Sequence, residues 1–442
     1  MDITTASAAQ IATKIKDGTW DAVEVCDAFL EGCASHPAQD QIYARMTESR
    51  AREDAMAARS RAKLGQPLGP LDGVPISWKD LFDTAGVATE SGSRLLEGRV
   101  PSQDALVLER ATRAGLVCLG KTHQTELAFS GLGVNPQTAT PPNALAPALA
   151  PGGSSSGAAV STKLGLAAAG IGSDTGGSVR IPAAWNDLVG LKTTHGRLPL
   201  TGVVPLCARF DTIGPLTHTV EDAALVFAAL DASKPVDLSA ASLSGRRVLV
   251  LDAQVLTPVD EAPERALQDA LSKLSSHGVV IDHAPAPMID EALPASAILF
   301  TAEAYATWRH LIAPHGDKMF APVRARFEAG KDLNAADYVA AWQMLERARA
   351  AFVDLIAGYD AVVLPTSPIL PPDTAQLLAD EAFFTERNLH ALRNTRVGNL
   401  MGSAALTLPT DTPHCGLMLV GGPGDEAQLL RLGAAMEPVL RG

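Results

Sequence analysis

Two glycine- and serine-rich segments, separated by a run of small apolar residues, constrain this chain more than any other feature. The first segment is Gly152–Gly157 and the second is Asp174–Ser178. Glycine and serine are disfavoured inside helices and strands, so both segments are predicted to be loops with an unusual backbone. The alanine-rich stretch between them, Ala158–Ala169, is predicted to be a helix. This helix would hold the two loops at a fixed separation.

Composition excludes several classes of protein. The chain has 442 residues, of which 47% are hydrophobic and 19% charged, which is typical of a globular protein with a large core. A formal net charge of -13 argues against nucleic acid as a partner, because phosphate binding needs clustered lysine and arginine. The five cysteines are scattered and the ten histidines form no H-x-x-x-H or H-x-H pair. We therefore expect no disulfide framework, no metal and no cofactor.

The sequence also gives an expectation for localisation. The N-terminal stretch MDITTASAAQIATKIKDG lacks the basic start and apolar run of a secretory signal. No segment reaches the roughly 18 to 20 uninterrupted apolar residues that a membrane span requires. We expect a cytoplasmic protein that acts on a small molecule and does not bind membranes.

Helices and short apolar strands follow one another along the chain, a rhythm typical of an α/β fold. The fold class predicted is a large mixed, mainly parallel β-sheet covered by helices on both faces, in a single domain over 1–442 with a helical insertion at 290–358. The predicted helices are Ala8–Lys16, Asp21–Cys33 with Thr19 as N-cap, Glu48–Lys63, Ser102–Gly115 with Ser102 as N-cap, Val220–Leu230, Pro263–Ser276, Ala335–Ile356 and Glu426–Leu440. The predicted strands are Gln41–Ala44, Leu71–Lys79, Leu116–Leu119, Arg247–Leu251, Val279–Asp282 and Ala361–Leu364.

The stretch 135–151, NPQTATPPNALAPALAP, is too rich in proline to form regular structure. It runs directly into the first serine loop, so it is either a rigid spacer or a wall of the site. As a wall, its apolar stretch from Pro141 to Pro151 favours an organic substrate over a highly charged one.

Familiar catalytic motifs fit the chain poorly. Gly153–Gly157 matches G-x-S-x-G, but no strand precedes it as a nucleophile elbow requires. Ser60–Lys63 matches S-x-x-K within a charged, solvated helix face. His123 and His195 lie nearest to the glycine-serine region, and each fits a structural or surface role better than that of a general base.

What remains is a lysine with two serines: Lys79 at the predicted end of a strand, and Ser154 and Ser178 in the two loops. These residues lie in the stretches GVPISWKD (73–80), GGSS (152–155) and DTGGSVRIPA (174–183). Together they resemble the amidase signature family, whose motif joins a GGSS loop to a DTGGSxRxPA segment behind an upstream GVPIxxKD. The similarity covers most of the chain and is highest in 70–220, the predicted signature core.

The resemblance implies a serine hydrolase with a Ser-cisSer-Lys catalytic triad. Ser178 would be the nucleophile, and Ser154, entered by a cis peptide, would pass its proton to Lys79. The physical chemistry agrees, because a serine hydroxyl needs a base and a lysine is a base only when burial keeps it neutral. The backbone N–H groups of Thr175, Gly176, Gly177 and Ser178 are the expected oxyanion hole. Asp174 and Arg180 would brace this loop, and Ser155 would orient Ser154 or Lys79.

The chain departs from the family pattern around the triad, at Pro141–Leu145, Ala184–Asp187 and Lys192–His195. The resemblance therefore supports the chemistry more strongly than any particular substrate.

The first hypothesis is a stand-alone amidase that cleaves amides or anilides, with carbamates (a urethanase activity) and ureas as close variants. It would act as a monomer or homodimer. The second is the glutamine-hydrolysing component of a tRNA-dependent amidotransferase, which needs a partner chain. The third, an inactive binding protein, is disfavoured by the intact Lys79, Ser154 and Ser178.

Overall fold

The computed structural model describes residues 2–441. Its centre is an eleven-stranded mixed sheet with strand order β1-β3-β2-β4-β6-β5-β10-β11-β9-β7-β8. The strands are β1 (Tyr43–Met46), β2 (Pro75–Lys79), β3 (Val117–Thr122), β4 (Ala169–Ser173), β5 (Val189–Lys192), β6 (Ile213–Thr217), β7 (Arg247–Asp252), β8 (Val280–Pro285), β9 (Ala361–Pro365), β10 (Ala405–Pro409) and β11 (Gly416–Val420).

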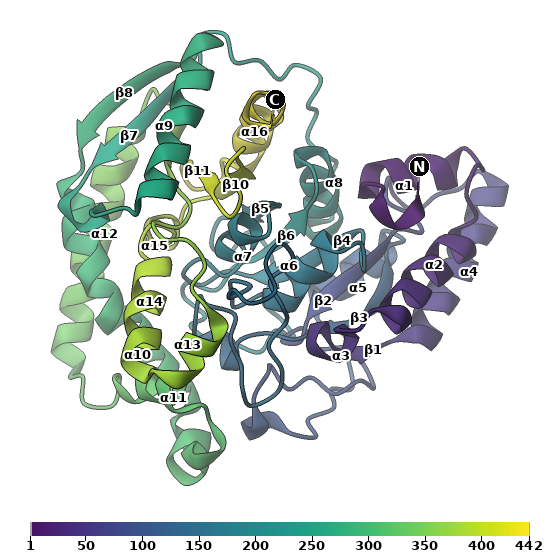
Figure 1. Cartoon of the computed structure of the whole chain (residues 1–442), viewed down its shortest axis with the longest axis horizontal. Coiled ribbons are helices and arrows are strands. Elements are labelled where there is room, and N and C mark those ends of the chain that lie inside the picture. Colours follow the sequence, from purple (N-terminus) through teal and green to yellow (C-terminus); the bar gives the residue numbers. More distant parts are fainter. Residues whose placement is uncertain (1, 442) are drawn as a thin grey trace.

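Sixteen α-helices flank this sheet in the described chain. They are α1 (Ala8–Lys16), α2 (Ala22–Ser35), α3 (Gln39–Ile42), α4 (Glu48–Leu64), α5 (Leu106–Arg113), α6 (Ser156–Lys163), α7 (Arg180–Trp185), α8 (Val220–Asp231), α9 (Glu261–Ser276), α10 (Pro287–His315), α11 (Ala321–Glu328), α12 (Ala335–Ile356), α13 (Thr374–Ala379), α14 (Glu381–Ala391), α15 (Arg396–Leu400) and α16 (Glu426–Leu440). Figure 1 shows α1, α2 and α4 at one end of the molecule, α10 and α12 with β7 and β8 at the other, and α6 and α7 between them.

The sheet is less parallel than expected. Only four of its ten strand pairings are parallel: β2 with β3 and β4, and β7 with β8 and β9. The middle of the sheet, from β4 through β6, β5, β10 and β11 to β9, is antiparallel. The prediction of a mixed sheet is confirmed, and the prediction that it is mainly parallel is wrong. The error arose because β5 and β6 follow each other with no helix between them, as do β10 and β11, and none of the four was recognised as a strand.

Helices cover both faces of the sheet, as the side chains of β10 illustrate. Its side chains alternate between faces, as in any strand. Leu406 and Leu408 face α16, where a Cβ added to Gly433 would lie 2.4 Å from Leu406 Cδ2 and 3.6 Å from Leu408 Cδ2. Thr407 points to the other face, toward Ala184 of α7. Both faces of this strand are therefore buried, and all five of its residues belong to the core.

The ends of several predicted elements agree with the structure, but the segment between the two loops differs. The predicted helix Ala158–Ala169 is the shorter α6, and its last residue instead begins strand β4. Gly165 has φ +68°, a left-handed conformation that ends the helix and favours glycine. The prediction of a single rigid helix was wrong, because helix α6 and strand β4 together separate the two loops.

Two predicted helix caps were also misplaced. The N-cap of α2 is Asp21 rather than Thr19, and the Asp21 carboxylate accepts a hydrogen bond from Val23 N–H at 2.8 Å. Helix α5 begins after Ala105, three residues beyond the predicted N-cap Ser102. Thr19 and Ser102 are cap-forming residue types, but the chain is not yet helical at either position.

The stretch predicted to be helical, 290–358, holds most of α10 together with α11 and α12, and α10 packs on both of the other helices. Aromatic residues join this layer to the rest of the core, since Phe210 packs edge-to-face on Phe300 of α10 and stacks on Trp342 of α12.

Among residues 2–441, no helix combines the length and apolar character needed to cross a bilayer.

Candidate active site

Lys79, Ser154 and Ser173 meet in the interior. Lys79 is the last residue of β2, and Ser173 is the last residue of the neighbouring parallel strand β4, so both side chains are at the same edge of the sheet. Lys79 Nζ lies 2.7 Å from Ser154 Oγ and 2.8 Å from Ser173 Oγ. All three residues are at most 4% exposed. The sequence analysis singled out Lys79 and Ser154 but missed Ser173, which its place directly before Asp174 could have indicated.

The loop that carries Ser154 is held from both sides. The peptide bond between Gly153 and Ser154 is cis, as the family resemblance implied. The carbonyl oxygen of Ser154 accepts a hydrogen bond from Thr125 N–H, and Ser155 N–H donates to the carbonyl oxygen of Ser178 at 3.2 Å. The Ser155 hydroxyl lies 3.2 Å from the carbonyl oxygen of Ser173 and accepts from Ser173 N–H. Ser155 thus joins the loop to Ser173, which itself contacts Lys79.

The surroundings of Lys79 lower the pKa of its ammonium group. Burial disfavours the charged ammonium and lowers the Lys79 pKa to about 7, although the negative charges of Asp174 and Asp211 oppose this effect. A substantial fraction of Lys79 is therefore neutral near pH 7, which is the condition for a lysine to accept a proton.

The second loop is held by Asp174 and Arg180. The Asp174 carboxylate accepts hydrogen bonds from the backbone N–H groups of Gly177 and Val179, and it pairs with the Arg180 guanidinium at 2.9 Å. Burial raises the pKa of the Asp174 carboxyl, but the neighbouring Arg180 outweighs this and holds that pKa well below its usual range. The loop is thus wrapped around one buried carboxylate.

Ser178 lies at the surface of a small cavity beside this loop. It is 3% exposed, and its hydroxyl makes no hydrogen bond with any residue in 2–441. The backbone N–H groups of Thr175, Gly176 and Ser178 likewise have no acceptor in this part of the chain. The Gly177 N–H differs from the expectation, because it already donates to Asp174 at 2.8 Å. Three of the four expected oxyanion donors are therefore free to bind a ligand.

Three further residues that support the site were missed in the sequence. Asp211 accepts a hydrogen bond from the Thr175 hydroxyl at 2.5 Å and from Leu206 N–H at 3.0 Å. Thr395 donates its hydroxyl to the carbonyl oxygen of Gly176 at 2.7 Å. Asn399 contacts both members of the ion pair, since it accepts from Arg180 at 2.6 Å and donates to Asp174 at 2.9 Å. Asp211 and Asn399 stand in no recognisable motif, so only the fold identifies them.

The cavity beside Ser178 has an empty volume of about 300 Å³, open solvent at its mouth included. Its lining combines the serine loop with aromatic, aliphatic and basic side chains: Ala128, Phe129, Ser130, Thr175, Gly176, Ser178, Leu206, Phe300, Arg326, Leu392 and Arg396. Arg326 and Arg396, on α11 and α15, were not anticipated from the sequence.

The proline-rich segment 135–151 does not line this cavity, contrary to the interpretation of it as a wall of the site. Asn143 fixes the segment elsewhere by donating to the carbonyl oxygens of Ala150 and Trp185, both at 3.1 Å. Leu149 pairs with Asp373 in an isolated β-bridge. The apolar character of this segment therefore says little about the substrate.

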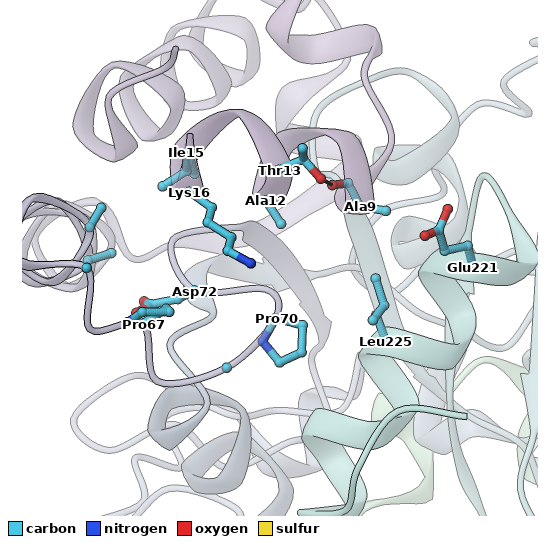
Figure 2. Close-up of a pocket in the computed structure, with 14 residues that line it drawn as sticks. Ala9, Ala12, Thr13, Ile15, Lys16, Pro67, Pro70, Asp72, Glu221 and Leu225 are labelled. Atoms are coloured by element: carbon cyan, nitrogen blue, oxygen red, sulfur yellow. Dashed lines mark hydrogen bonds between the residues drawn. The ribbon is translucent and has the colours of Figure 1, made fainter. Parts of the chain in front are cut away.

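A second cavity, with an empty volume of about 1240 Å³ on the same measure, shares no lining residue with the first. Figure 2 shows its lining, in which Ala12 and Lys16 of α1 face Pro70 and Leu225. Of its two acidic lining residues, Asp72 and Glu221, the first is already paired with Arg61 at 2.6 Å. Within residues 2–441, no three His, Cys, Asp or Glu side chains cluster as a metal site would require.

Comparison with known proteins identifies the class. The model of the family described as Amidase matches residues 24–430, so the chain belongs to the amidase family, the one whose signature its motifs resemble. Its mixed, helix-flanked sheet agrees with a solved amidase structure that covers 98% of this chain and is itself fully covered, with 28% identity and a TM-score of 0.87. The protein is an amidase, a hydrolase of C–N bonds.

Relatives whose names indicate other activities have higher sequence identity to this chain than that amidase structure has. A protein of Comamonas testosteroni named 2-amino-5-chloromuconic acid deaminase is 35% identical, with 93% of this chain and 92% of the relative covered. The A subunit of the glutamyl-tRNA(Gln) amidotransferase from Chloroflexus aggregans is 31% identical, with coverage of 97% and 95%. Similarity alone therefore leaves the substrate open.

Proposed function

We propose that this amidase hydrolyses the C–N bond of a small carboxamide or anilide through an acyl-enzyme on Ser178, without a partner chain. The observation that carries the proposal is the 2.7 Å contact between the buried Lys79 Nζ and the hydroxyl of Ser154. The loop that carries Ser154 is in turn hydrogen-bonded to Ser178, because Ser155 N–H donates to the Ser178 carbonyl oxygen. Carbamates and ureas present the same carbonyl beside nitrogen and belong to the same substrate class.

In the first half of the reaction, neutral Lys79 accepts a proton from Ser154 as Ser154 takes the proton of Ser178. Serine can relay a proton because its hydroxyl donates and accepts at once. The Ser178 oxygen attacks the carbonyl carbon, and the N–H groups of Thr175, Gly176 and Ser178 stabilise the resulting oxyanion. The tetrahedral intermediate then collapses, the C–N bond breaks, and the amine leaves with the proton returned through Ser154.

In the second half, water replaces the amine. Lys79 and Ser154 accept a proton from the water, which attacks the ester carbonyl of the acylated Ser178. The ester bond breaks, and Ser178 recovers its proton from Ser154. The net reaction is amide plus water giving a carboxylic acid plus an amine, or ammonia from a primary amide.

The test is hydrolysis by the purified chain alone, using glutamine, aliphatic amides, aryl anilides, an aryl carbamate and an aryl ester. We expect turnover of at least one amide or anilide, a covalent adduct on Ser178 detected by intact-mass and peptide analysis, and loss of both in Ser178→Ala. Activity that survives in Ser178→Ala would refute the mechanism.

The relative from Chloroflexus aggregans supports a second candidate, the glutamine-hydrolysing component of an amidotransferase. That function predicts glutamine as the preferred substrate and a requirement for a partner chain. Unaided hydrolysis of other amides, by a monomer or homodimer, would count against it.

A further inference from the structure

Two arginines reach the cavity that ends at Ser178, and neither has an anionic partner. Arg326 comes from α11 and Arg396 from the first turn of α15. Arg396 lies over the loop Asp174–Ser178, since a Cβ added to Gly176 would be 3.7 Å from Arg396 Cγ. Gly176 and Ser178 line the same cavity as both arginines. The two positive charges therefore border the place where a substrate carbonyl would meet Ser178.

Neither guanidinium is neutralised by the described part of the chain. In residues 2–441, no carboxylate forms an ion pair with Arg326 or Arg396, and neither side chain donates a hydrogen bond. The Nη1 atom of Arg326 is buried without a partner, and its guanidinium lies 4.3 Å from the centre of the Phe129 ring. Arg180, buried nearby, differs sharply because it is paired with Asp174 at 2.9 Å.

Two unpaired guanidinium groups at one cavity are energetically unfavourable unless an anionic ligand binds there. Burial and the nearby Arg396 lower the pKa of Arg326 to about 9, and burial lowers that of Arg396 to about 10, so both remain charged at neutral pH. Both residues are half-buried, and a charge partly withdrawn from water without a counter-charge is unfavourable, the more so because two like charges face one cavity. An anion in the cavity would offset both effects. Guanidinium groups bind planar carboxylates particularly well, because their N–H groups can form two parallel hydrogen bonds with them.

We propose that the amide substrate also carries a carboxylate, which Arg326 and Arg396 bind while Ser178 attacks the amide carbonyl. This inference rests on the function proposed above and specifies its substrate class as the monoamides of dicarboxylic acids. The small size of the cavity favours a short spacer between the carboxylate and the amide. The reaction would release a dicarboxylate and an amine or ammonia.

The experiment compares acids with matched neutral amides. Succinamic, glutaramic and adipamic acids are tested against butanamide, pentanamide and hexanamide, which have the same chain lengths and no carboxylate. Each pair is measured with the unaltered protein, Arg326→Met, Arg396→Met and the control Arg309→Met. Arg309 is exposed on α10, outside the cavity lining. Isothermal titration of the same acids into Ser178→Ala measures binding separately from turnover.

We expect kcat/KM to be roughly 10- to 100-fold higher for at least one acid than for its neutral partner, as expected for charge-assisted hydrogen bonds. Each arginine variant should lower kcat/KM for the acid several-fold more than for its neutral partner, mainly by raising KM for the acid, while Arg309→Met changes neither. Arg326→Lys should restore part of the preference, because it restores the charge.

Other outcomes separate this inference from the proposed function. Ser178-dependent hydrolysis without preference for any acid, or equal losses for acid and neutral amides in the arginine variants, would overturn the inference and leave the function intact. Acids that bind Ser178→Ala through the arginines, in a protein that hydrolyses no amide, would support the carboxylate site and refute the function. Absence of both binding and turnover of the acids would overturn the inference.

Discussion

Asp174 and Arg180 form a fully buried ion pair that joins the two ends of the loop carrying Ser178. Their charged atoms lie 2.9 Å apart, and each side chain is 0% exposed. Removing one member of such a pair leaves an uncompensated charge in the interior. We expect Arg180→Met to lower the free energy of unfolding by about 3 to 5 kcal/mol, measured by urea titration. The exposed pair Arg265 and Glu261 supplies the control, because Arg265→Met should cost at most about 1 kcal/mol. Equal effects of the two substitutions would contradict this account.

The two hydroxyls that contact Lys79 should not be equivalent. Ser154 would relay protons between Lys79 and Ser178, whereas Ser173 only positions the lysine. We expect Ser154→Ala to lower kcat by about 10²- to 10⁴-fold. Ser173→Ala removes one hydrogen bond of Lys79 and should cost about tenfold. Both are measured by steady-state kinetics on one neutral amide, with circular dichroism to verify folding. A larger loss in Ser173→Ala would refute the assigned relay.

Activity should follow the deprotonation of Lys79. A pKa of about 7 means that the neutral base is scarce at pH 5 and predominant at pH 8 and above. We therefore expect kcat/KM for a neutral amide to rise with pH through about 7 and then level off. Lys79→Ala should abolish this rise together with most of the activity. A rise centred near pH 10 would instead indicate a lysine with an ordinary pKa.

Two adjacent glycines in the loop Asp174–Ser178 should respond differently to substitution by alanine. Gly177 has φ +139°, and a Cβ there would lie 2.2 Å from Thr395 Oγ1. We expect Gly177→Ala to destabilise the protein by about 1 to 3 kcal/mol and to displace Ser178. At Gly176 the nearest atoms to an added Cβ are 3.7 Å away, so Gly176→Ala should change stability by no more than about 0.5 kcal/mol. Thermal and urea unfolding of both variants provide the comparison, and similar losses would contradict it.

The sequence predicted correctly those helices, strands and site residues that are marked by a pattern of neighbouring residues. The boundaries of α1, α12 and α16 were predicted correctly, since each has a clear helical pattern with recognisable ends. The strand that ends at Lys79 was also predicted, with its start placed too early. Lys79 and Ser154 could be found because their motifs are contiguous, and the structure brings them within 2.7 Å of each other.

The features that were missed depend on contacts between distant parts of the chain. Strands β10 and β11 are buried on both faces, so their sequences lack the alternation that marks a half-buried strand. Arg326 stands beside Arg324 in a segment that looks like an ordinary basic helix surface, and Arg396 is the one basic residue of the short helix α15. Their proximity to Ser178 arises only when α11 and α15 pack beside the loop Asp174–Ser178.

The contacts of Asn399 with Arg180 have a consequence for biosynthesis. These two residues are 219 positions apart, and Thr395, which holds Gly176, is equally distant from its partner. During translation the segment with both serines leaves the ribosome long before the residues that hold it in place are made. A nascent chain that stops before Thr395 would contain Lys79, Ser154 and Ser178, the proposed triad, but would lack the contacts that hold the loop carrying Ser178. Hydrolase activity would therefore appear only after Thr395 and Asn399 have been synthesised and have packed against the loop.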